Sequence, residues 1–161
     1  MKKKKTSVPQ ALMAGLAGSV ALTAIHETVR QFRPKDAPRM DVLGMRGLRK
    51  LLGKADAPQP DNDTLYGLTM VGDIISNGLY YSLVGSGRDA IRRGLLLGMA
   101  AGVGGVLLPG PLGLGEGPSN RTPQTKLMTV AWYTVGGLVA GAVAKQLRRK
   151  PGRRSNTGKR P

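Results

Sequence analysis

Asp73 is the one charged residue within the 23-residue stretch 64–86, where it could serve as a proton or cation relay. Ser76 and Asn77 follow it by three and four positions and Tyr80 by seven, so in a helix these polar side chains share one face. A carboxylate deep in a bilayer costs ~2.5–3.5 kcal/mol, so it must be protonated, paired or next to water. The alternative to a relay is a neutral Asp73 that is hydrogen-bonded to a hydroxyl or amide group on a neighbouring helix.

Three further ionisable residues, His26, Glu27 and Arg30, close the first apolar stretch of the chain. The spacing of Glu27 and Arg30 allows an ion pair along a helix. His26 is the sequence's only histidine, and together with Glu27 and Asp73 it could offer ligands to a divalent metal. Because the spacing of these residues matches no metal motif, an interfacial salt bridge is the preferred interpretation, and no metal or cofactor is predicted.

Enzyme signatures are otherwise missing from the sequence. The chain has no cysteine, which excludes disulfides, thiolate nucleophiles and zinc bound by cysteine. The glycine-rich run 102–105 follows no predicted strand, so it is no dinucleotide loop. With one histidine and one acid inside an apolar stretch, little acid–base machinery is available, and we predict that the protein is not an enzyme.

The elements that position these residues are four stretches nearly free of charge. About 20 helical residues cross the ~30 Å of hydrocarbon in a bilayer, and each stretch can reach that length by extending into its flanks. The predicted fold class is therefore all-α, a single transmembrane bundle over residues 8–147. The alternative is a soluble domain with buried core helices. The predicted spans are 8–28, 64–86, 90–108 and 126–147.

The charge lies between and outside these stretches. The chain has 25 Lys and Arg against 9 Asp and Glu, a net charge of +16. A nucleic-acid binder would gather this charge on one folded face and would need stacking aromatics, yet aromatics make up only 4% of the chain. A soluble, basic, helical nucleic-acid binder is therefore the least favoured alternative.

The basic ends of the chain bear on topology. The N-terminal segment 1–7 and the tail 148–161, predicted to be disordered, are both rich in Lys and Arg. With four spans and both termini in the cytoplasm, 15 of the 25 basic residues lie inside, as the positive-inside tendency favours. The alternative is that residues 1–21 are a cleaved secretory signal, which would leave three spans.

The first loop contains a short basic amphipathic helix, predicted over 40–53. Leu48, Leu51 and Leu52 lie three and four apart, and the basic residues point elsewhere. Such a helix suits a membrane interface, where it would contact anionic lipids or a protein partner. Packing on the bundle's own rim is the alternative. The residues predicted to make the contact are Arg46, Arg49 and Lys50.

Small residues at four-residue spacing form ridges on three of the four spans. Close backbone contact through such ridges holds helices together in lipid, where no hydrophobic force acts between them. The ridges indicate a tight bundle, a homo-oligomer or a membrane-complex partner, with packing inside one chain as the alternative. The predicted packing residues are Ala14, Gly18, Gly94, Gly98, Gly102, Gly137 and Gly141.

This layout resembles that of small four-helix proteins of the bacterial inner membrane, which implies a location in that membrane with both termini cytoplasmic. Since packing signals are plentiful and chemistry is sparse, the predicted function is a non-enzymatic scaffold or accessory subunit embedded in the lipid bilayer. The competing class is a small channel or a proton- or cation-coupled transporter that uses Asp73.

Overall fold

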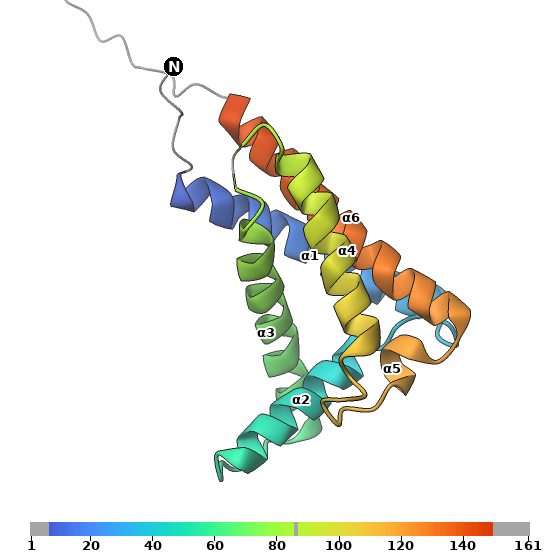
Figure 1. The fold of residues 1–161 in the computed structure, drawn as a ribbon. Coiled ribbons are helices and arrows are strands. Elements are labelled where there is room, and N and C mark those ends of the chain that lie inside the picture. The colour runs from blue at the N-terminus through green and yellow to red at the C-terminus, as the bar shows by residue number, and fades with distance from the viewer. Residues whose placement is uncertain (1–6, 86, 150–161) are drawn as a thin grey trace, which may run out of the picture.

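The computed structural model describes residues 7–85 and 87–149, and within them the chain is all-helical, with no strand (Figure 1). The all-α fold class predicted from the sequence is therefore confirmed. The elements are α1 (Val8–Phe32), α2 (Met40–Lys54), α3 (Asn62–Ser82), α4 (Ala90–Leu107), α5 (Gly117–Asn120) and α6 (Pro123–Arg149).

Capping and turn residues explain how α2 gives way to α3. α2 ends at Lys54, and Asp56 in the following turn has a positive φ of 53°. The side chain of Asp61 then accepts hydrogen bonds from the backbone N–H groups of Asp63 (3.0 Å) and Thr64 (2.9 Å). This cap satisfies two amides that have no partner inside the helix, and α3 begins there.

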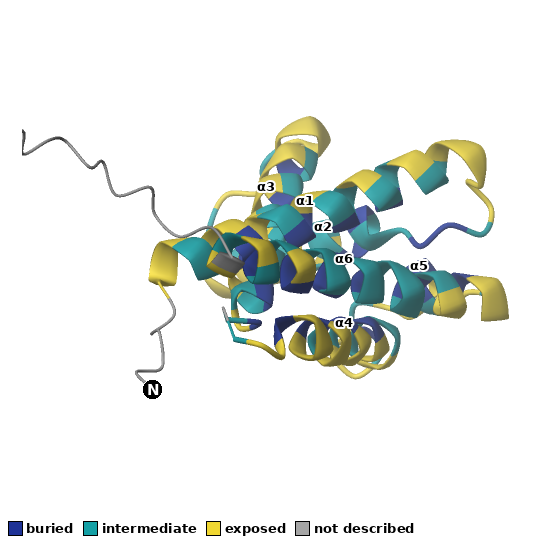
Figure 2. Ribbon diagram, turned by 90° about the horizontal axis from the view of Figure 1, so that it is seen from above, coloured by how far each residue is buried: buried dark blue, intermediate teal, exposed yellow. Residues whose placement is uncertain are grey.

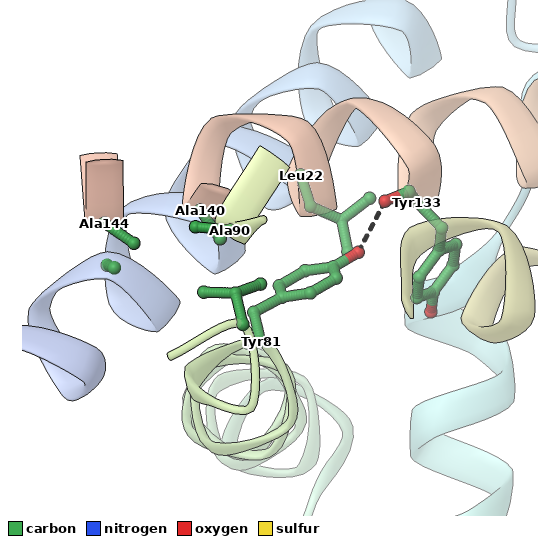
Figure 3. Close-up of a cluster of buried hydrophobic side chains, with 8 residues drawn as sticks. Leu22, Tyr81, Ala90, Tyr133, Ala140 and Ala144 are labelled. Atoms are coloured by element: carbon green, nitrogen blue, oxygen red, sulfur yellow. Dashed lines mark hydrogen bonds between the residues drawn. The ribbon is translucent and has the colours of Figure 1, made fainter. Parts of the chain in front are cut away.

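α6 is the central helix of the molecule. It packs against α4 on one side and α1 on another, and α1 also packs against α3 (Figure 1). α2 crosses the start of α3, and the short α5 lies beside α6. The core lies where α1, α3, α4 and α6 meet, and the Tyr81 hydroxyl there donates a 2.7 Å hydrogen bond to the carbonyl oxygen of Tyr133 (Figure 3). The other labelled core residues are Leu22, Ala90, Ala140 and Ala144.

The predicted small-residue ridges face one another inside this chain. A Cβ atom added to Gly94 would lie 2.1 Å from the carbonyl oxygen of Gly137, and one added to Gly98 would lie 2.6 Å from the Cα atom of Thr134. At Gly102 and Gly141 the nearest backbone atoms of the opposite helix would be 2.6 Å away. At these distances α4 has no room for a side chain at its glycines, so it meets the backbone of α6 directly.

α1 uses small residues in the same way. A Cβ atom on Gly18 would lie 2.5 Å from the carbonyl oxygen of Gly136 on α6, and Ala14 is fully buried. Gly15, which was not among the predicted packing residues, is just as tight, because a Cβ atom there would lie 2.1 Å from the carbonyl oxygen of Gly78 on α3. α1 therefore packs closely against both α6 and α3.

Three helices of the described residues are long and apolar enough to cross a membrane, namely α1, α4 and α6. α3 is not among them, because polar residues such as Thr69, Asp73 and Asn77 lower its hydropathy. Three of the four predicted spans thus coincide with helices that could cross a membrane by length and composition, and the one over α3 does not. In Figure 2 most of the outer side of α4 is exposed, and its buried residues are those in contact with α6.

Helix boundaries differ from the prediction in places. α1 continues to Phe32 rather than ending near residue 28, and α3 ends at Ser82 rather than at 86. α6 continues to Arg149, so the predicted tail is helical at its first two residues. The rest of the tail and residues 1–6 of the basic N-terminal segment lie outside the described residues, and the signal-peptide alternative falls partly there.

Candidate functional site

Asp73 is held by two side chains, one from its own helix and one from α1. The amide of Asn77 donates a 2.8 Å hydrogen bond to one carboxyl oxygen, and the hydroxyl of Thr23 donates one of 3.3 Å to the other. The Ser76 hydroxyl donates to the backbone carbonyl of Asp73, and the Tyr80 hydroxyl donates to the carbonyl of Leu97 on α4. Within the predicted polar stripe, Asp73 therefore bonds to α1 and Tyr80 bonds to α4.

A network of charged side chains joins α1, α2 and α3. Arg30 pairs with Glu27 along α1, as the spacing predicted, and its guanidinium also lies 3.0 Å from a carboxyl oxygen of Asp41 on α2. Arg39 binds the same carboxylate through two nitrogens, at 2.9 and 2.8 Å. The Tyr66 hydroxyl on α3 lies 3.4 Å from both Glu27 and Arg30. We name Glu27, Arg30, Arg39, Asp41 and Tyr66 the charged junction.

Asp41 is the centre of the charged junction, with a side chain only 6% exposed. Burial by itself raises the pKa of the Asp41 carboxyl, but the hydrogen bonds and charge of Arg39, with the charge of Arg30, outweigh burial and lower it below its usual value. The same hydrogen bonds raise the pKa of the Arg39 guanidinium. Asp41 is therefore ionised in the folded protein, and its charge is shared by two arginines.

His26 lies beside the charged junction but outside its ion pairs. Its ring contacts that of Tyr133 edge-on, with 5.8 Å between centroids, and its Nε2 atom is buried without a hydrogen-bond partner among the described residues. The Thr69 hydroxyl is in the same condition. Both residues line a cavity of about 20 Å³ that Asp41 and Asp73 also border, and this is room for about one water molecule.

The described residues contain no cluster of side chains that could hold a divalent metal. Within residues 7–85 and 87–149, no three His, Asp or Glu side chains come together as a metal site requires. Of the predicted cluster at the end of the first span, Glu27 and Arg30 form the expected pair, whereas His26 joins no salt bridge.

A groove of about 620 Å³ opens between α3 and α4, and we name it the α3–α4 groove. Ser76, Asn77 and Tyr80 line one wall. Small residues of α4, from Ala100 to Gly105, line the other. α2 and the segment 108–114 close one end of it (Figure 1). Asp73 borders this groove as well as the small cavity beside His26.

The three basic residues predicted to contact lipid or a partner bind different parts of the chain. Arg46 donates a 2.7 Å hydrogen bond to the carbonyl oxygen of Leu114, and Lys50 donates one of 2.6 Å to that of Leu112. Arg49 points instead to the side chain of Asn62 at the start of α3. Arg46 and Lys50 thus tie α2 to the segment that closes the groove, and all three side chains are exposed.

The described residues define the class of the molecule as an all-helical protein with three apolar helices that suggest a membrane location. Comparisons with models of protein families, with curated proteins and with solved structures find no match.

Proposed function

We propose that the protein is a polytopic membrane protein in which α1, α3, α4 and α6 cross the bilayer and α2 lies along its surface, and that it acts as a non-enzymatic scaffold or accessory subunit. The observation that carries the proposal is the outer face of α3. Its large apolar side chains are 51–63% exposed, while Asp73 is hydrogen-bonded to Thr23 on α1 and Tyr80 to the carbonyl oxygen of Leu97 on α4. These exposed residues are Leu68, Val71, Ile75, Leu79 and Leu83.

This arrangement is the reverse of a water-soluble helix, whose apolar stripe faces the core. α3 has 21 residues and is therefore about 31 Å long, enough to cross the hydrocarbon. Apart from Asp63 in its first turn, the one charged residue of the helix is Asp73, which is hydrogen-bonded to Thr23 and Asn77 and does not face outward. The same outward exposure of large apolar residues, among them Leu16 on α1 and Leu96 on α4, supports contact with lipid around the bundle (Figure 2).

Single cysteines test this topology directly, because the chain has none of its own. If α3 crosses the bilayer, Ala57→Cys before it and Arg88→Cys after it react with a membrane-impermeant maleimide from opposite sides of sealed inner-membrane vesicles. Labelling of both from the same side would contradict a fourth span. Retention of the chain in the membrane after a carbonate wash is the companion result, and its release would overturn the membrane proposal itself.

The proposed location is the bacterial inner membrane, with both termini cytoplasmic. Arg88→Cys would then share the accessibility of the termini, and Ala57→Cys would be periplasmic. For assembly, the glycines of α4 and α6 already face each other, so a second copy or a partner subunit would bind the exposed faces or α2. Crosslinking through cysteines at Val71 or Leu96 distinguishes a homo-oligomer from a complex with another protein.

The second candidate function is proton or cation transport through Asp73. It is favoured by the position of that residue, which borders both the α3–α4 groove and the small cavity beside His26. Transport predicts that Asp73→Asn abolishes flux in reconstituted vesicles while the chain stays folded. Equal flux for the two proteins, or none above empty vesicles, would leave Asp73 as a residue that joins α3 to α1.

A further inference from the structure

The α3–α4 groove has the size and the mixed lining of a ligand site. Small-molecule sites typically measure ≈300–1,000 Å³ and combine apolar walls with a few polar groups, and this groove measures about 620 Å³. The wall formed by α4 is made of alanine and glycine, while Leu108 and Leu112 extend the apolar surface at the closed end. A narrow apolar slot of this kind fits a flexible hydrocarbon chain.

Contacts along other helices keep the groove open. α3 is fixed to α1 by the Ser19 hydroxyl, which donates a 2.8 Å hydrogen bond to the carbonyl of Ile74, and α4 is fixed to α6 by its glycines. One side-chain hydrogen bond joins α3 to α4 among the described residues, from Tyr80 to the carbonyl of Leu97 at the end away from α2. The groove therefore belongs to the packing of the bundle and does not require a ligand to form.

Two cations lie just outside the end of the groove beside α2, where they bind carbonyl oxygens of residues that line it. Arg46 and Lys50 each spend one donor on the carbonyls of Leu114 and Leu112, and because a guanidinium has five N–H donors and an ammonium three, both keep donors free. The carboxylate of Glu116 accepts a hydrogen bond from Asn120 and, like the two cations, does not line the groove. An anionic group at this end would thus meet two fixed, exposed positive charges.

We propose that the α3–α4 groove binds one anionic glycerophospholipid, whose phosphate lies at Arg46 and Lys50 and whose acyl chain runs between α3 and α4 toward Tyr80. The inference rests on the proposed membrane location, in which α2 lies at the level of the lipid headgroups. Charge at one end and apolar walls along the remaining length match the two parts of such a lipid in order.

The test uses the purified full chain in detergent, titrated with phosphatidylglycerol or with phosphatidylcholine and analysed by native mass spectrometry. The wild type is expected to bind one phosphatidylglycerol, and its preference over phosphatidylcholine is on the order of tenfold. Inorganic phosphate at millimolar concentration does not displace it. Equal binding of the two lipids, or displacement by phosphate alone, would overturn the proposal.

Gly104→Leu fills the groove at small cost to the fold, because the nearest atom to an added Cβ is the side-chain Cδ1 of Leu108, at 3.4 Å. It is expected to reduce lipid binding by about tenfold or more. The matched control is Gly67→Leu on the outer side of α3, where an added Cβ meets nothing within 4 Å. Unchanged binding by Gly104→Leu, or an equal loss in Gly67→Leu, would contradict the groove as the site.

The double variant Arg46→Gln/Lys50→Gln decides the headgroup contact even if Gly104→Leu does not fold. It should lose the preference for phosphatidylglycerol, while Arg49→Gln, which removes a cation of the same helix that bonds to Asn62, should keep it. An equal preference in the two variants would overturn the headgroup assignment. A carbonate wash separates the failures, since a chain that stays in the membrane without binding lipid refutes this inference alone.

Discussion

Along the contact between α4 and α6 the two helices meet backbone to backbone, whereas α1, α2 and α3 are joined at the charged junction by side chains that carry charge. In the first region glycines of α4 lie against the backbone of α6, and a Cβ atom on Gly94 or Gly137 would lie 2.1 Å from a carbonyl oxygen. In the second, the buried carboxylate of Asp41 is bound by two arginines.

The difference separates a steric constraint from an electrostatic one. Close packing of helix backbones depends on dispersion and shape, so it is insensitive to pH and intolerant of added volume. The charged junction depends on ionisation, so it tolerates changes of volume at its edge and is sensitive to pH. The packing of α4 on α6 holds the bundle, while the charged junction fixes α2, which closes one end of the α3–α4 groove.

The largest expected effect is that of a bulky residue between α4 and α6. Gly98→Leu is predicted to destabilise the folded chain by about 3 kcal/mol, since its Cβ alone would lie 2.6 Å from the backbone of Thr134. Titration with SDS, followed by circular dichroism, measures the loss, and a native gel shows whether assembly is also lost. Gly104→Leu, on the other side of the same helix, controls for the substitution. Equal stability of the two variants would refute the steric interpretation of this contact.

Removal of the charge at the centre of the charged junction comes next. Asp41→Asn is predicted to cost about 1–2 kcal/mol, less than a fully buried pair would, because the Arg30 and Arg39 side chains are 29% and 39% exposed and water partly solvates them. Asp56→Asn on the exposed turn after α2, where asparagine suits the positive φ, is the control. The SDS titration also checks this prediction, and an unchanged midpoint for Asp41→Asn would contradict it.

The pH dependence of stability distinguishes the two regions. The pKa of Asp41 is lower in the folded chain than its ordinary value of 3.8, so the folded state binds fewer protons, and the stabilisation is present above pH ~4 and lost as the pH falls through the folded pKa. The wild type should therefore lose more stability than Asp41→Asn when the pH falls from about 5 to about 3, a range that includes the ordinary pKa of an aspartate. Parallel pH profiles for the two proteins would exclude this role of Asp41.

The smallest expected effect lies at Asp73. Thr23→Val removes the longer of its two hydrogen bonds, at 3.3 Å, and is predicted to cost about 0.5–1 kcal/mol. Thr28→Val, on an exposed part of the same helix, should change little. Thermal unfolding in detergent compares them. A loss from Thr28→Val as large as that from Thr23→Val would remove the assigned contact between α1 and Asp73.

Local patterns in the sequence predicted the helices and the contacts between residues that are close along the chain. The apolar stretches gave the long helices, leucine spacing gave α2, and the separation of three residues gave the pair between Glu27 and Arg30. The prediction missed Asp41, Arg39 and Tyr66, whose contacts join residues from three helices. Periodicity in one helix carries no information on the angle at which another helix crosses it.

Asp73 and His26 illustrate the same limit. The predicted spans 8–28 and 64–86 put His26 near the end of one helix and Asp73 well inside the other, yet both residues border one cavity. Thr23 precedes Glu27 by one helical turn, and a search for hydroxyls on the inner face of α1 would have identified it. The α3–α4 groove follows from the separate attachment of α3 to α1 and of α4 to α6, which no single segment encodes.

The reciprocal contact of Gly94 with Gly137 limits how this protein can change over generations. A larger residue on one side of a contact is usually compensated by a smaller residue opposite, but the residue opposite is already glycine, and nothing smaller exists. A genetic selection that starts from Gly94→Val should therefore return revertants at that codon and no compensating change at Gly137. The helix pair would stay fixed in its separation while the exposed surface of the protein is free to vary.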